Sequence, residues 1–154
     1  MNRKLLFWII GVLSVIGLAL AIESTVAHYA PIEHSFCNIS ETFDCSAVNR
    51  GPYSEFLGIP VALMGLVAYV FFLVAIVAYA NKKNETLLTL MGTAAIIGLA
   101  FSAYLTYLEA FVIFAWCIIC IGSAVTMVFL FSAIMYLRYI ESKPQTHSKE
   151  EIHQ

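Results

Sequence analysis

The chain has 154 residues, of which 61% are hydrophobic and only 12% are Asp, Glu, Lys or Arg. A soluble domain of this length has too high a surface-to-volume ratio to bury so much apolar surface, so we expect a lipid bilayer to solvate it. The net charge of −2 comes with no basic stripe, which argues against a nucleic-acid partner. The length favours a single domain.

Four apolar segments are long enough to cross a bilayer as helices, which takes roughly 20 residues each. They lie at about 5–22, 59–80, 87–108 and 111–137. The last two are joined by a very short turn, which predicts a tight antiparallel hairpin. We therefore expect an all-α integral membrane fold, a bundle of four transmembrane helices over residues 1–141 with a long loop at 23–58. The polar segment 142–154 contains a proline and is predicted to be a disordered tail.

The basic residues predict the orientation of these segments. Of the eight Lys and Arg residues, only Arg50 lies in the loop at 23–58. By the positive-inside rule, both termini face the cytoplasm, and this loop faces the outer side of the cell membrane. Arg3, Lys4 and the Ala19–Ala21 stretch (ALA) also resemble a cleavable signal peptide. The apolar run exceeds the roughly 7 to 15 residues of such a peptide, so we favour a retained first helix.

The four cysteines fall on or near the predicted outer side. Cys37 and Cys45 lie in the long loop, and Cys117 and Cys120 lie near the outer end of the fourth segment. An even number of cysteines facing an oxidising compartment favours disulfide chemistry. Cys117 and Cys120 share one helical face, and a helix N-terminus lowers the pKa of a thiol. We place Cys120 about 10 Å into the membrane, where a lipid-soluble head group can reach it.

Other interpretations of these cysteines remain open at this point. Buried cysteines are often small apolar filler, and the pairs could form two purely structural disulfides. No metal site is expected, because Cys37 and Cys45 are spaced more widely than in a usual zinc knuckle. A thiol-based redox sensor would need an output surface, which the short cytoplasmic segments do not offer. Redox catalysis is the interpretation that we favour.

Distinctive motifs surround the cysteines in both halves of the chain. They are Asp44–Asn49 (DCSAVN), Ser54–Pro60 (SEFLGIP), Leu63–Gly65 (LMG), Ala103–Glu109 (AYLTYLE) and Trp116–Cys120 (WCIIC). In this combination and order, the motifs resemble those of the vitamin K epoxide reductase family, particularly its prokaryotic branch. The resemblance covers about residues 36–125.

The resemblance implies a four-helix bundle around a quinone, covered on the outer side by a short amphipathic capping helix at about 46–57. It also implies a cysteine relay. Cys120 reacts with the quinone, Cys117 exchanges with Cys45, and Cys37 completes the path to a substrate protein. The implied activity is that of a quinone-dependent thiol oxidoreductase. No thioredoxin-like domain follows the fourth segment, so a separate thioredoxin-like thiol oxidase on the outer side is the expected partner.

Two positions depart from the vertebrate members of the family. Val61 and Ala124 stand where those members have an asparagine and a tyrosine that touch the naphthoquinone. This favours a respiratory quinone of the menaquinone or ubiquinone type. A vitamin K quinone or epoxide reductase, and a non-catalytic membrane protein with two structural disulfides, remain the alternatives.

The quinone pocket itself is harder to assign from the sequence. Phe111 and Phe114 lie close to the Cys117–Cys120 pair and are candidates for stacking on the quinone ring. Ser54 is a candidate for a hydrogen bond from the capping helix to a quinone oxygen. Glu109 falls at the outer turn between the last two segments, where we expect water to solvate it.

Overall fold

The computed structural model describes residues 2–29 and 44–142. In chain order the elements are α1 (Arg3–Tyr29), α2 (Cys45–Arg50), β1 (Glu55–Phe56), β2 (Ile59–Pro60), α3 (Val61–Asn81), α4 (Glu85–Leu108), the π-helix η2 (Glu109–Ile113) and α5 (Ile118–Ser142). Cys37 and the predicted tail beyond residue 142 lie outside the described residues.

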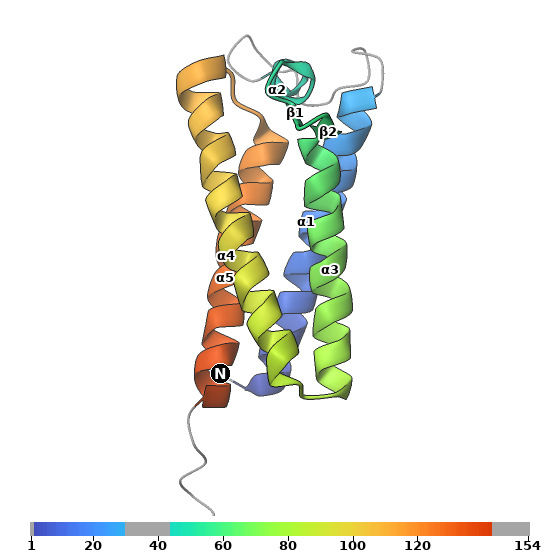
Figure 1. The fold of residues 1–154 in the computed structure, drawn as a ribbon, viewed down its shortest axis with the longest axis vertical. Coiled ribbons are helices and arrows are strands. Elements are labelled where there is room, and N and C mark those ends of the chain that lie inside the picture. The colour runs from blue at the N-terminus through green and yellow to red at the C-terminus, as the bar shows by residue number, and fades with distance from the viewer. Residues whose placement is uncertain (1, 30–43, 143–154) are drawn as a thin grey trace, which may run out of the picture.

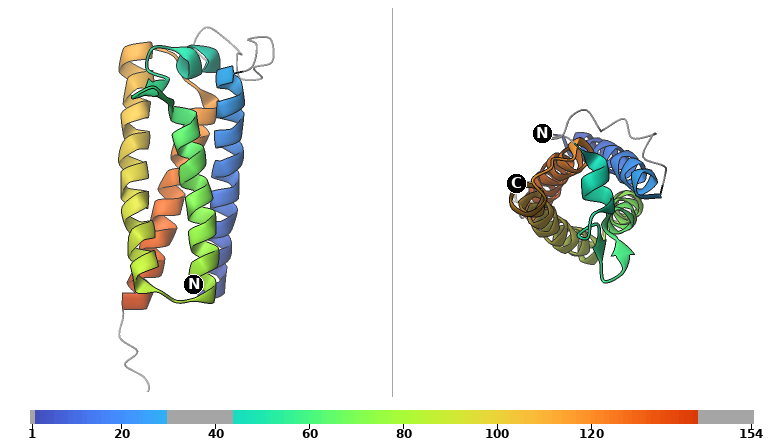
Figure 2. Two further views of the ribbon diagram at one scale, coloured as in Figure 1. Left: turned by 45° about the vertical axis from the view of Figure 1, so that its right-hand side comes forward. Right: turned by 90° about the horizontal axis from the view of Figure 1, so that it is seen from above.

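The four long helices α1, α3, α4 and α5 stand side by side as a bundle (Figures 1 and 2). The helix α1 packs against α3 and α5, and α5 packs in turn against α4. The short helix α2 and the antiparallel pair β1–β2 lie across one end of the bundle, which we call the α2 end. All four long helices are long and apolar enough to cross a membrane. The expected all-α membrane bundle is confirmed.

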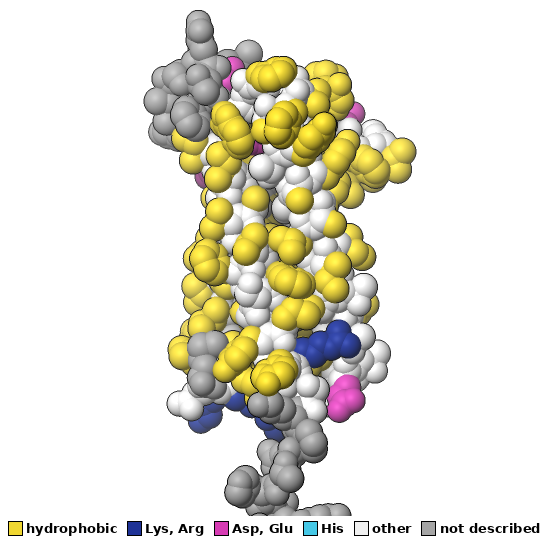
Figure 3. Space-filling model, turned by 90° about the vertical axis from the view of Figure 1, so that its left-hand side faces the viewer, with side chains coloured by type: hydrophobic (Ala, Val, Ile, Leu, Met, Phe, Trp, Pro, Cys, Tyr) yellow, Lys and Arg dark blue, Asp and Glu magenta, His cyan; other side chains and the backbone are white. Residues whose placement is uncertain are grey.

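The surface of the bundle is apolar along its length (Figure 3). Large side chains such as Trp8, Val67 and Ile97 are more than half exposed, as expected for residues that face lipid. On the face that Figure 3 shows, Lys and Arg side chains gather only near the end opposite α2. At that end Arg3 forms an ion pair with Glu141, which links α1 to α5.

The well-packed part of the core lies toward the end opposite α2. Its fully buried side chains include Leu6, Ile10, Phe72, Met91, Leu130, Ile134 and Leu137. Higher in the bundle α1 and α3 meet at Gly17. A Cβ on Gly17 would lie 2.0 Å from the ring of Tyr69, so this approach of the two helices requires a glycine. Tyr69 is buried, and its hydroxyl lies 3.0 Å from both the carbonyl oxygen and the hydroxyl of Ser123 on α5.

The α2 end differs from the expected capping helix at 46–57. The helix α2 ends at Arg50, because Gly51 and Pro52 follow it and neither continues a helix well. The rest of the segment forms the β1–β2 hairpin, whose turn residues Leu57 and Gly58 both have positive φ, 55° and 78°.

Two long helices also have different bounds from those expected. The helix α1 continues to Tyr29, seven residues past the expected end at Ile22. The last helix begins at Ile118 and not near 111. The reversal of the chain after α4 takes the π-helix η2 and a left-handed residue, Phe114, with φ 56°. This longer turn, and not a tight hairpin, sets the positions of the cysteines.

Candidate active site

The helix α2 fixes the position of Cys45. Asp44 caps its N-terminus, and the Asp44 carboxylate accepts hydrogen bonds from the backbone N–H groups of Ser46 and Ala47 at 2.8 and 3.1 Å. Cys45 is therefore the first helical residue, and Asn49 lies one turn later on the same face. Both side chains are buried beneath α2. The short helix thus presents a cysteine and an amide to the interior of the α2 end.

Cys117 occupies the N-cap position of α5. Its carbonyl accepts a hydrogen bond from the Ile121 N–H at 2.9 Å, and its Sγ accepts one from the Cys120 N–H at 3.4 Å. This is the arrangement in which Ser or Asp side chains usually cap a helix. Cys120 lies in the first turn of α5. We expected both cysteines inside the last helix, but α5 starts seven residues later than expected, so that Cys117 precedes the helix.

The turn before α5 brings Cys117 against Cys45. The two Sγ atoms lie 3.0 Å apart, although the residues are 72 positions apart in the chain. Cys45 is disulfide-bonded, whereas Cys117 and Cys120 are free thiols. A bonded S–S pair lies at about 2.05 Å. A shift of about 1 Å therefore separates the contact between Cys117 and Cys45 from a covalent bond.

The environment of Cys117 favours its thiolate. The hydrogen bond with the Cys120 thiol is the largest influence and lowers the pKa of Cys117, against the opposing effect of burial. The backbone N–H groups of Cys120 and Ile119 act in the same direction. A thiolate is the form that attacks disulfides. Cys117 is therefore prepared for exchange with the sulfur that it contacts.

Asn49 ties α2 to α1 and to Cys117. Its side-chain N–H₂ group donates to the Cys117 Sγ at 3.8 Å, and its side-chain oxygen accepts from the Ser24 hydroxyl at 2.8 Å. The backbone oxygen of Asn49 contacts the ring Nδ1 of His28. Arg50 donates to the backbone oxygen of Ala27 at 3.0 Å. These contacts hold the position of Cys45 above Cys117. Nothing in the sequence pattern indicated this role for Asn49.

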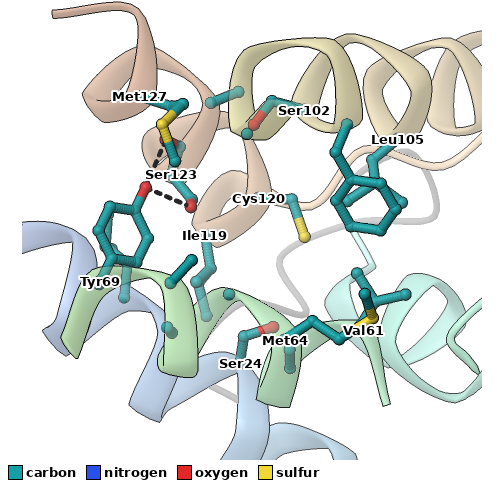
Figure 4. A pocket seen from close by; sticks show the side chains of 18 of the residues that line it. Ser24, Val61, Met64, Tyr69, Ser102, Leu105, Ile119, Cys120, Ser123 and Met127 are labelled. Carbon is teal, nitrogen blue, oxygen red and sulfur yellow. Dashed lines mark hydrogen bonds between the residues drawn. The ribbon is translucent and has the colours of Figure 1, made fainter. Parts of the chain in front are cut away.

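A cavity of about 560 Å³ lies inside the bundle, directly below α2. The Cys120 sulfur points into it, toward Met64 and Leu105 (Figure 4). Cys117 does not line the cavity. Of the pair Cys117 and Cys120, which we call the inner pair, Cys117 therefore faces Cys45 and Cys120 faces the cavity.

The lining of the cavity is mainly apolar, with a few polar groups. It comes mostly from the four long helices, with α2, the loop that follows it and η2 contributing at the α2 end, and Tyr69 lies on the side away from Cys120 (Figure 4). Val67 and Ile97 line the cavity although their side chains are 61% and 64% exposed. Since these two residues lie on α3 and α4, the cavity opens between those helices toward the lipid-facing surface. Its volume is in the range of sites for small organic ligands.

Of the residues that the sequence suggested for the quinone pocket, some line the cavity and others do not. Ser54 lines the cavity, as do Val61 and Ala124. Phe111 and Phe114 do not; their side chains are 65% and 74% exposed at the α2 end. The left-handed conformation of Phe114 turns the chain there and leaves its ring on the surface.

Glu109 is the site residue that the sequence interpretation misplaced. Its side chain is 2% exposed, so the expected solvation is wrong. The carboxylate accepts a hydrogen bond from the Cys117 N–H at 3.2 Å and also lines the cavity. The physical reason is that the chain turns back after the π-helix that begins at Glu109, so that Cys117 lies against the Glu109 carboxylate. The available signal was an ionisable residue at the end of an apolar segment, which often marks function in membrane proteins.

Comparison with known proteins agrees with this geometry. No curated protein sequence is similar enough to this chain to count as a match. The family model of the vitamin K epoxide reductase family matches residues 8–135, which is most of the chain and includes α3, α4, most of α1 and α5, and all four cysteines. The chain therefore belongs to the vitamin K epoxide reductase family, whose members are quinone-linked thiol oxidoreductases of membranes.

Proposed function

We propose that this protein oxidises the thiols of a thioredoxin-like partner to disulfides and passes the electrons to membrane quinone. The observation that carries this proposal is the position of the inner cysteine pair. Cys117 lies 3.0 Å from the disulfide-bonded Cys45, while its neighbour Cys120 lines the cavity. Electrons that reach Cys45 therefore have a path of direct sulfur contacts to the cavity.

The first half of the proposed relay moves electrons inward from the partner. A partner thiolate attacks a Cys37–Cys45 disulfide, and the second partner thiol resolves the mixed disulfide, so that the partner leaves oxidised. The Cys45 thiolate then attacks Cys117 in a Cys117–Cys120 disulfide and releases the Cys120 thiolate. Cys37 attacks Cys45 and frees Cys117. Cys45 is disulfide-bonded and Cys117 and Cys120 are free thiols, which is the state expected when this first half of the relay is complete.

The second half restores the inner disulfide. A quinone supplies the acceptor for two electrons and two protons. The apolar lining, the few polar groups and the opening between α3 and α4 suit an aromatic head group with an apolar tail. Cys120 faces that head group, and Cys117 closes the Cys117–Cys120 bond. The α2 helix covers the cavity and limits the access of water to both thiols.

A respiratory quinone of the menaquinone or ubiquinone type is the proposed acceptor. Val61 and Ala124 both line the cavity, and neither side chain can donate a hydrogen bond to a substrate oxygen. This supports a quinone over the vitamin K epoxide as the substrate. Ser54 remains available in the lining for a hydrogen bond to a quinone oxygen.

The proposed location is the cell membrane, with both termini in the cytoplasm and the α2 end outside. Arg3, Lys4, Lys82 and Lys83 lie at the end opposite α2, whereas Arg50 lies on α2 itself. This distribution supports the orientation by the positive-inside rule. It also puts the cysteines in a compartment where disulfides persist.

The direct test uses the purified protein in detergent, with a reduced thioredoxin-like protein as electron donor and short-chain menaquinone or ubiquinone as acceptor. The expected result is one quinol formed per partner disulfide, with loss of turnover in each of the four single Cys→Ala variants. A protein that keeps its disulfides under these conditions and forms no quinol would instead have two structural disulfides.

A further inference from the structure

Glu109 lies beside the inner cysteine pair, in the wall of the cavity. Its carboxylate accepts the Cys117 N–H at 3.2 Å, and Cys120 is close enough to influence its ionisation. It belongs to the cavity lining together with Cys120, yet only 2% of its surface is exposed. A single side chain thus contacts Cys117 and shares the cavity wall with Cys120.

A purely structural role does not require an acid at this position. The Cys117 N–H would be satisfied equally well by the oxygen of a neutral amide such as glutamine. Burying a carboxyl group in a mainly apolar wall costs free energy, which an amide of the same shape would reduce. What the carboxyl group adds is the ability to take up and release a proton beside a thiol.

We propose that Glu109 is the proton relay between Cys120 and the quinone. This inference rests on the proposed function. The Glu109 carboxylate takes the proton of the Cys120 thiol, so that Cys120 becomes the thiolate and Glu109 the neutral acid. As the Cys117–Cys120 bond forms, two electrons leave the sulfurs for the quinone. The neutral Glu109 returns its proton to a quinone oxygen, and the proton that Cys117 gives up on ionising supplies the second oxygen. Two S–H bonds are broken, one S–S bond is formed and one quinone becomes quinol.

The other charged groups of the α2 end are engaged elsewhere. Arg50 of α2 donates to a backbone carbonyl of α1, and His28 of α1 contacts the backbone of Asn49 and lies 3.9 Å from Glu55. The titratable groups that face Glu109 among the described residues are therefore the Cys117 and Cys120 thiols. Proton exchange at Glu109 is thus coupled to the redox pair itself.

The test compares Glu109→Gln with Glu109→Asp. The glutamine variant keeps the shape and the hydrogen-bond acceptor for the Cys117 N–H, but it cannot carry a proton. We expect it to slow quinol formation about 100-fold, the usual scale of general acid–base catalysis. The wild-type rate should fall at acid pH as the Glu109 carboxylate and the Cys117 thiolate are protonated, and in Glu109→Gln only the part of this fall that comes from Cys117 should remain. The aspartate variant should regain part of the rate and the pH dependence.

A second readout needs neither quinone nor turnover. In quinone-free protein with reduced inner thiols, infrared difference spectra between pH steps should show a carboxyl band that changes together with the thiol S–H band. Glu109→Gln should lose the carboxyl band. Exchange between Cys45 and Cys117, followed by alkylation and mass spectrometry, should not slow in this variant, because the Glu109 charge opposes the ionisation of Cys117.

The two proposals fail in different ways. Absence of quinol formation by the wild-type protein overturns the proposed function. Wild-type turnover together with a Glu109→Gln rate and pH profile equal to those of the wild type overturns the relay alone. A variant that loses exchange and quinol formation equally would show that Glu109 has only a structural role.

Discussion

The Sγ atom of Cys117 contacts the Sγ atom of Cys45 at 3.0 Å, and the same Cys117 Sγ caps the N-terminus of α5. One sulfur atom therefore serves as a helix cap and as the proposed bridge to the loop. Because the cap donors are backbone N–H groups, the sulfur is held in place by the helix itself. The helix α5 influences the reactivity of this sulfur through the N–H group that bonds to it, and the helix α2 places Cys45 against it.

The first prediction concerns the pH dependence of Cys117. Since its pKa is lowered, chiefly by the hydrogen bond with the Cys120 thiol, its thiolate should persist below the pH at which an ordinary thiol is protonated. The stability gained from this shift is present above the ordinary thiol pKa and is lost as the pH falls through the lowered value. The pKa of Cys117 is measured from the ultraviolet absorbance of the thiolate as a function of pH, after the absorbance of Cys117→Ser is subtracted from that of the wild type. Cys120→Ala should raise the pKa of Cys117; an unchanged titration would contradict the assigned cause.

The second prediction concerns the packing of α1 against α3. Gly17→Ala puts a methyl group against the Tyr69 ring, which cannot shift easily because its hydroxyl is bonded to Ser123. We expect a loss of about 1 to 3 kcal/mol of stability, measured by thermal unfolding in detergent. Gly11→Ala on the same helix is the control, since nothing lies within 4 Å of its added Cβ. Equal unfolding temperatures for the two variants would contradict this packing.

The third prediction concerns the hold of Asn49 on the reacting sulfurs. Asn49→Ala removes the hydrogen bonds to Cys117 and Ser24. Each such bond contributes about 0.5 to 1.5 kcal/mol, so exchange between Cys45 and Cys117 should slow by up to roughly tenfold. Quenched-flow alkylation follows that exchange. Asn84→Ala removes an asparagine cap at the other end of the bundle and should leave the rate unchanged. If exchange in Asn49→Ala were as fast as in Asn84→Ala, Asn49 would have no role in positioning the two sulfur atoms.

The fourth prediction concerns orientation. Single cysteines placed at Lys83 and at Ser46, in a protein whose native cysteines are replaced, should label differently in intact cells. An impermeant maleimide should reach the residue at 46 and not the one at 83. The reverse pattern would put the cysteines on the cytoplasmic side and remove the support for a disulfide-generating role.

The sequence predicted the four spans well, because long apolar runs without charges have few other solutions. The order of the four cysteines in the relay stays a prediction. It could not predict the burial of Glu109, because that depends on a π-helix and a left-handed Phe114 that lengthen the turn. The contacts of Asn49 could not be predicted either, because its partners Ser24 and Cys117 are distant in sequence. Stacking by Phe111 and Phe114 was suggested by nearness in the chain, but the turn leaves both rings on the surface.

The most direct test of the relay is disulfide mapping in Cys120→Ser, purified with the loop disulfide at Cys45 intact and without a reduced partner. The Cys117 thiolate can then attack Cys45 and release Cys37 as a thiolate, Cys120 is absent and cannot resolve the new bond, and immediate alkylation of Cys37 prevents its return. The expected product is a stable Cys45–Cys117 disulfide, seen as one cross-linked peptide pair by mass spectrometry. The matched Cys117→Ser protein should form no Cys45–Cys120 bond, because Cys120 faces the cavity. A Cys45–Cys120 bond in Cys117→Ser, with Cys117 left free in Cys120→Ser, would contradict the assigned order of the two cysteines.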